Sequence, residues 1–178
     1  TKQVSDRTIY LDDGNGNSLI TFDRTNLETA FTNQAGLASK LGDAGATDND
    51  GNDIESSEID KMINWTKGMD VDDDDNDKSF TDMRNDVFGD PLHSKPLVVN
   101  YGDSIRIVVR TNAGALHMFE DSGTTVKENW AFMPKEFIGN IKSLRNNYSS
   151  VDKIYGIDGE ITVLLNDIGG DGAIDGDD

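Results

Sequence analysis

Hydrophobic and polar residues alternate in two separate parts of the chain, and a period of two predicts β-strands. "RTIYL" and "SLITF" flank the turn-rich "DDGNGN", so we expect a hairpin over residues 7–22. From residue 96, "PLVVNY", "SIRIVVRT", "ALHMFE" and "VKENWAFM" follow one another with short turns between them. Four such meandering strands make one blade of a β-propeller, or equally half of a sandwich. "EITVLLND", residues 160–167, predicts a further strand that begins another sheet.

Between the two β regions the period of the apolar residues becomes helical. Thr25 and Glu28 form a capping box, which predicts a helix over residues 26–41. The spacing of apolar residues predicts a second helix at about 57–67 and a third at about 135–147. The fold class that follows is mainly β, with a helical insertion.

The segments fall into three parts of one structural domain. Residues 1–24 are the leading β-hairpin, residues 25–86 the helical insertion with its acidic loops, and residues 87–178 the blade region. The blade region contains about one complete four-stranded blade and parts of its neighbours. We therefore expect the chain to be a fragment of a propeller, within a larger protein.

The charge of the chain favours cations as partners. Its 34 acidic and 16 basic residues give a formal net charge of −18, which makes nucleic acid and anionic membrane surfaces poor partners. Of the 34 acidic residues, 27 are aspartate, a residue that suits loops and hard metal ions better than helix surfaces. No apolar run is long enough to insert into a membrane.

The best candidate metal site is the glycine-rich tail, "DIGGDGAIDGDD". Its spacing fits the calcium-loop template, with Gly172 at the turn. The predicted Ca²⁺ ligands are Asp167, Asp171, Ala173 through its carbonyl, Asp175 and Asp178. Gly169 stands where the template places another ligand, so a polar turn that binds nothing stays open as the alternative.

The acidic run "DVDDDDNDK" is a second candidate metal site, and it can be interpreted in two registers. Alternate positions are occupied either by Asp72, Asp74 and Asn76 or by Asp73, Asp75 and Asp77, with Asp82 as a further ligand in either register. The second register puts Lys78 where a calcium loop needs glycine. A solvated acidic loop is the alternative. A weaker third candidate comprises Asp48, Asp50, Asn52 and Asp53.

Catalytic residues are not indicated by the sequence, and we expect no enzyme. The two histidines, His93 and His117, each lie in a stretch that the blade architecture explains, so structural roles are expected for both. No nucleophile motif, P-loop or dinucleotide fingerprint is present. Trp130, Phe119 and Phe132 sit at strand spacing and are expected in the core.

Four segments together carry a resemblance to a known family: "FGDPLHSKPLVVNYG", "RIVVRTNAGALHMFEDSG", "NWAFMPKEF" and "YGIDGEITVLLND". In this order they resemble the propeller domain of PilY-type proteins, the type IV pilus biogenesis factors and tip-associated adhesins of Gram-negative bacteria. The matching residues are Gly89, Asp90, His93, Ser94, Pro96, Asn112, Gly114, Leu116, His117, Phe119, Trp130, Phe132 and Pro134. The chain departs from the family pattern at Ala113, where aspartate is usual.

The resemblance implies a calcium-binding propeller that supports pilus assembly, adhesion and twitching motility. It implies minor pilins at the pilus tip as partners, a host-surface ligand as a further one, and a location in the periplasm, the outer membrane or at the cell surface. The alternative function is a quinoprotein dehydrogenase of the PQQ type, whose propeller also uses calcium. A third interpretation is a calcium-dependent docking module, which would need duplicated calcium loops.

Overall fold

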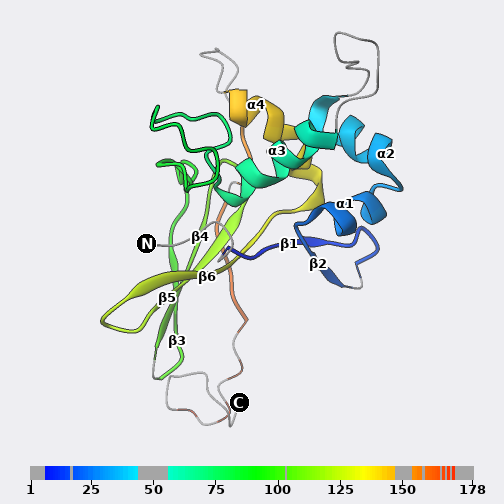
Figure 1. The fold of residues 1–178 in the computed structure, drawn as a ribbon. Coiled ribbons are helices and arrows are strands. Elements are labelled where there is room, and N and C mark those ends of the chain that lie inside the picture. The colour runs from blue at the N-terminus through cyan, green and yellow to red at the C-terminus, as the bar shows by residue number, and fades with distance from the viewer. Residues whose placement is uncertain are drawn as a thin grey trace, which may run out of the picture.

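The computed structural model describes residues 7–16, 18–43, 56–102, 104–146, 154–157, 159–164, 166, 168 and 170. In this part of the chain, six strands form one sheet in the order β2-β1-β6-β5-β4-β3 (Figure 1). The strands are β1 (Ile9–Asp12), β2 (Leu19–Thr21), β3 (Leu97–Asn100), β4 (Ile105–Arg110), β5 (Leu116–Asp121) and β6 (Val126–Phe132).

The two predicted β regions belong to the same sheet. Strands β3 to β6 pair antiparallel with their neighbours in chain order, which confirms the four-stranded meander. The predicted hairpin of β1 and β2 also forms. Strand β1 then joins β6 in parallel, with Ile9 opposite Ala131. The described sheet is therefore mixed and open, with β2 and β3 at its edges.

The helix predicted over residues 26–41 is wrong as a single element. Helix α1 (Arg24–Ala30) and helix α2 (Gln34–Ala38) replace it, followed by a π-helical segment, Ser39–Asp43. The Asp23 side chain caps α1 by accepting a hydrogen bond from the Asn26 amide at 3.0 Å. The chain breaks at Thr32, whose φ of 79° no helix allows.

The other two predicted helices are present. Helix α3 (Ser56–Lys67) ends at Gly68, whose φ of 101° lies in the region that favours glycine. The third predicted helix begins as a 3₁₀ turn, Lys135–Asn140, and continues as helix α4 (Ile141–Asn146).

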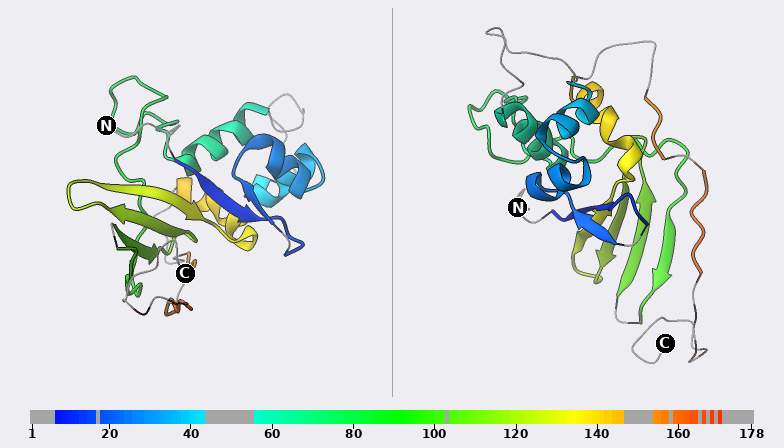
Figure 2. Two further views of the ribbon diagram at one scale, coloured as in Figure 1. Left: turned by 90° about the horizontal axis from the view of Figure 1, so that it is seen from below. Right: turned by 90° about the vertical axis from the view of Figure 1, so that its right-hand side faces the viewer.

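The hydrophobic core lies between the helices and one end of the sheet. Its fully covered members include Leu11, Phe22, Leu27, Ile59 and Ile138. The helices gather at this end, and the meander β3 to β6 extends away from them (Figures 1 and 2). The prediction that Trp130, Phe119 and Phe132 belong to this core is wrong, because all three side chains are only half-buried and none belongs to the core cluster.

The predicted strand over residues 160–167 belongs to no sheet in the described residues. Residues 159–164 run extended along the meander (orange in Figures 1 and 2) but form no ladder with it. The Leu164 side chain is 97 % exposed. Among the described residues, this part of the prediction is therefore wrong.

Candidate metal centre

The acidic run forms a loop closed at its neck by backbone contacts. Immediately after α3, Met69 pairs with Met83 in an isolated antiparallel bridge. The Asp70 amide donates a hydrogen bond to the Asp82 carbonyl at 2.9 Å. Residues 70–82 therefore form a closed loop whose two ends are held side by side. We call residues 68–84 the acidic loop.

Three carboxylates of the acidic loop converge. Asp73, Asp75 and Asp77 each offer one oxygen, and these three oxygens lie within 4.8 Å of one another. One oxygen of each side chain also accepts a backbone hydrogen bond: Asp73 from the Lys78 amide at 2.9 Å, Asp75 from the Asp77 amide at 3.2 Å, and Asp77 from the Ser79 amide at 2.7 Å. The second of the two predicted registers is thus the one that the fold assembles.

The backbone of the acidic loop has the turn that this register requires. Lys78 stands where a calcium loop places glycine, and its φ is 70°, in the left-handed region. Asp73 at 56° and Asn76 at 61° share that region, which aspartate and asparagine enter more readily than lysine does. Lysine in place of glycine therefore raises the free energy of the turn, but the turn itself forms.

Two further carboxylates stand at the neck. The Asp70 side chain is 2 % exposed, and both of its oxygens accept a hydrogen bond from the Asp74 amide, at 2.9 and 3.0 Å. Asp82 Oδ1 is buried and has no hydrogen-bond partner within the described part of the chain. A buried carboxylate oxygen without a donor is a position that a cation can satisfy.

The charges at the neck act on the cluster. The hydrogen bond from the Asp77 amide lowers the pKa of Asp75. This lowering is outweighed by desolvation and by the negative charges of Asp77, Asp82 and Asp70. The pKa of Asp75 is therefore raised above its ordinary value. Negative charge is therefore concentrated around Asp75, which favours binding of a cation there.

The first predicted register is not assembled, because Asp72 has another partner. Arg145 of α4 donates to both oxygens of Asp72, at 2.8 and 2.7 Å, and its third nitrogen lies 2.5 Å from a Glu58 oxygen on α3. The hydrogen bonds from Arg145 dominate and lower the pKa of Asp72 despite its desolvation. Asp74 lines a cavity next to the loop. The carboxylates that converge are therefore fewer than the predicted set of candidate ligands.

The other two candidate metal sites lie outside the described residues. This applies to the tail ligands Asp167, Asp171, Ala173, Asp175 and Asp178, and to the weaker set Asp48, Asp50, Asn52 and Asp53. Both remain predictions.

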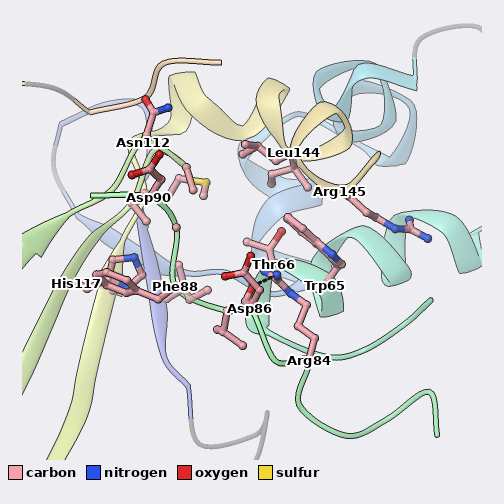
Figure 3. A pocket seen from close by; sticks show the side chains of 18 of the residues that line it. Trp65, Thr66, Arg84, Asp86, Phe88, Asp90, Asn112, His117, Leu144 and Arg145 are labelled. Atoms are coloured by element: carbon pink, nitrogen blue, oxygen red, sulfur yellow. Dashed lines mark hydrogen bonds between the residues drawn. The ribbon is translucent and has the colours of Figure 1, made fainter. Parts of the chain in front are cut away.

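A cavity of about 1140 Å³ adjoins the acidic loop (Figure 3). Its walls come from α3, α4, the sheet and the segment after the loop, and its apolar floor includes Ile9, Ala131 and Met133. The Arg84 guanidinium stacks over the Trp65 ring at 4.0 Å from the centroid and donates to the Asp86 carbonyl. Arg84 Nε is buried without a partner among the described residues, and burial lowers the pKa of Arg84.

A buried ion cluster lies on another wall of the cavity. Arg7 donates to both oxygens of Glu128, at 2.6 and 3.0 Å, and His117 Nδ1 lies 2.7 Å from the same carboxylate. Burial raises the pKa of Glu128, but the hydrogen bonds from His117 and Arg7 and the charge of Arg7 lower it far below its ordinary value. His117 lies in β5 and stacks on Phe119. Its structural role stays a prediction.

Several residues of these sites are not apparent from the sequence. Glu128 and Arg7 are 121 positions apart, and Arg145 lies 73 positions from Asp72, so no local pattern links either pair.

In comparisons with known proteins, no family model, no curated protein and no solved structure matches the chain. Among the described residues, no helix has the length and apolar character needed to cross a membrane.

Proposed function

We propose that this chain binds a calcium ion in the acidic loop, through Asp73, Asp75 and Asp77 with Asp82 as a further ligand. The observation that carries the proposal is the convergence of three carboxylate oxygens within 4.8 Å of one another. The donor set contains oxygen alone, which suits hard cations rather than zinc or copper. Calcium takes six to eight oxygens in variable geometry, and carbonyl groups and water would complete the shell.

The charge of the cluster supports a divalent ion rather than an empty loop. Three carboxylates repel one another, and Lys78 is the only basic residue within residues 70–82. The buried oxygen of Asp82 lacks a donor, and the pKa of Asp75 is raised although the Asp77 amide lowers it. A bound cation reverses this balance, because each carboxylate becomes a ligand instead of a repelling neighbour.

For the whole protein, the proposal is a PilY-type factor in type IV pilus biogenesis, adhesion and twitching motility. It rests on the sequence resemblance, and the four-stranded meander is consistent with it. Met118 and Trp130 face each other on one side of the meander and are only half-buried, as expected for a propeller blade that packs against neighbouring blades. Minor pilins would be the partners, and the periplasm or cell surface the location.

Calorimetric titration of calcium tests the metal site. Because the tail is a second predicted site, the titration compares the unchanged chain, Asp75→Asn, Asp175→Ala and the double variant. We expect Asp75→Asn to remove one bound calcium per chain whether or not Asp175 is intact. Asp121→Asn is the charge-matched control, since Asp121 ends β5, outside the acidic loop, and it should bind as the unchanged chain does. Unaltered calcium binding by Asp75→Asn would contradict the site.

The wider role requires a genetic test. In the bacterium that encodes the protein, Asp75→Asn in the full-length gene should reduce surface pili or twitching, and Asp121→Asn should not. Normal pili after complete deletion of the gene would refute the pilus role and leave the calcium site unaffected.

A further inference from the structure

The cavity combines an apolar floor with a wall that contains aromatic and charged side chains. Its buried lining residues include Ile9, Ala131 and Met133, which form the floor. Trp65 and Phe88 supply aromatic rings from opposite sides of it (Figure 3). The volume of about 1140 Å³ is ample for a small organic molecule, since ligand pockets in proteins measure roughly 300–1,000 Å³.

Within the described part of the chain, Arg84 is the one cation of the cavity wall that makes no ion pair. Its guanidinium donates a hydrogen bond to the Asp86 carbonyl and lies over the Trp65 ring, at 4.0 Å from the centroid. Its Nε is buried and has no acceptor among the described residues. Buried N–H groups normally have an acceptor, and the N–H groups of a guanidinium match the two oxygens of a carboxylate. Arg84 is therefore suited to bind an anionic group.

The other two cations of the wall already have carboxylate partners. Arg7 donates to both oxygens of Glu128, at 2.6 and 3.0 Å. Arg145 donates to both oxygens of Asp72 and to Glu58. An anion that enters the cavity would therefore compete with these carboxylates at Arg7 and Arg145, but not at Arg84.

Three acidic residues also line the cavity, and all of them are exposed to solvent: Asp74, Asp86 and Asp90. The negative charges of Asp86 and Asp74 act on Arg84 through space, but neither carboxylate is hydrogen-bonded to its guanidinium in the described structure. Water and salt screen exposed charges, so these carboxylates oppose a bound anion less than buried ones would. The hydrogen-bond donors of Arg84 remain available.

The wall opposite Trp65 is held in place by contacts of its own. His117 is 3 % exposed, and its Nδ1 lies 2.7 Å from the Glu128 carboxylate. The Phe88 ring packs against His117, with ring centroids 5.0 Å apart. This aromatic wall is therefore formed before a ligand binds, which lowers the entropy that binding costs.

We infer that the cavity binds a small organic anion, with its carboxylate on Arg84 and its apolar body over the floor of Ile9, Ala131 and Met133. The apolar body is required because a purely polar anion would leave the floor in contact with water. The carboxylate is required because it supplies the acceptor that Arg84 lacks in the described structure. The inference is independent of the proposed calcium site.

Two fluorescent probes separate the charge of the ligand from its apolar body. Anilinonaphthalene sulfonate is an aromatic anion, and phenylnaphthylamine has the same aromatic body without the anionic group. We expect the chain to bind one molecule of the sulfonate, and Arg84→Gln to weaken this binding roughly tenfold without changing the binding of phenylnaphthylamine. Arg106→Gln is the matched control, because Arg106 lies in β4, contacts Tyr101 and does not line the cavity. It should bind both probes as the unchanged chain does.

Nuclear magnetic resonance tests the unmodified chain with a carboxylate. Naphthoate should shift the Arg84 Nε–H and Trp65 indole signals in a saturable manner and displace the sulfonate, and the neutral naphthalenemethanol should displace it about tenfold less well. Equal binding of the sulfonate by Arg84→Gln and the unchanged chain would overturn the inference. So would naphthoate shifts confined to residues that do not line the cavity, or the absence of saturable binding of the sulfonate and naphthoate. Calcium binding by the acidic loop is unaffected by any of these results.

Discussion

Replacing Lys78 by glycine should stabilise the protein, because Lys78 occupies a backbone conformation that glycine adopts at no steric cost. Its φ is 70°, and the loop holds it there through the hydrogen bond from its amide to Asp73 Oδ1 at 2.9 Å. An L-residue with a side chain pays a steric penalty in this region, where Cβ approaches the carbonyl oxygen.

The size of the effect follows from two opposing terms. The left-handed conformation costs a residue other than glycine roughly 1–2 kcal/mol. Glycine in turn loses more conformational freedom on folding, by roughly 0.5–1 kcal/mol. The net gain expected for Lys78→Gly is therefore about 0.5–1 kcal/mol. Lys78→Gln is the matched control, because it removes the same charge and keeps the Cβ atom.

Urea unfolding followed by circular dichroism, with calcium removed by a chelator, measures this difference. We expect the midpoint of Lys78→Gly to exceed that of Lys78→Gln by a few tenths of a molar, at an unchanged slope. Equal midpoints, or a lower one for the glycine variant, would mean that the loop does not hold residue 78 in the left-handed region. The register assigned to the carboxylate cluster would then be wrong.

Two further predictions concern the ion pairs. Glu128→Gln should lower the free energy of unfolding by about 3–5 kcal/mol in urea, because it leaves Arg7 buried without its carboxylate. Folding lowers the pKa of Glu128 from its ordinary value of 4.5. Ionised Glu128 therefore contributes fully to the free energy of unfolding above pH 4.5, and this contribution is lost as the pH falls below that value. In a plot of stability against pH, the loss of stability in acid should therefore be smaller for Glu128→Gln. Arg145→Gln should cost only about 0.5–1 kcal/mol by the same urea assay, since its partners Asp72 and Glu58 are well exposed to solvent. The pKa of Asp72 is also lowered on folding, so ionised Asp72 makes a smaller contribution to the free energy of unfolding that is likewise lost on acidification. Because this contribution depends on Arg145, it should be absent when the stability of Arg145→Gln is measured against pH. If Arg145→Gln lowered the free energy of unfolding as much as Glu128→Gln does, solvent would not be weakening the Arg145 ion pairs.

Local sequence patterns predicted a helix or strand correctly where only one start or stop signal was present. The meander β3 to β6 followed from alternation and turn residues, and α3 followed from its helical period and from Gly68. The first helical region failed because two start signals compete there. Thr25 offered a capping box, but Asp23 caps the helix two residues earlier. Asn33 then starts α2 as a second cap.

The candidate site was predictable as a stretch but not as a set of ligands. Both registers of the acidic run lacked the loop glycine, so spacing alone could not choose between them. The choice depends on Arg145, which binds Asp72 from a distant helix and leaves Asp73, Asp75 and Asp77 to converge. Such a contact depends on the tertiary fold. The prediction of an aromatic core was wrong for a similar reason, since strand spacing does not reveal which positions of a sheet other elements cover.

The most direct test of the calcium site is to locate the ion. Crystals grown with calcium, measured at a wavelength where calcium scatters anomalously, should show a peak between the carboxylates of Asp73, Asp75 and Asp77, with oxygens at about 2.3–2.6 Å. Asp82 should contribute a further oxygen to the same ion. A fully ordered acidic loop with no peak at this position, in crystals saturated with calcium, would contradict the account.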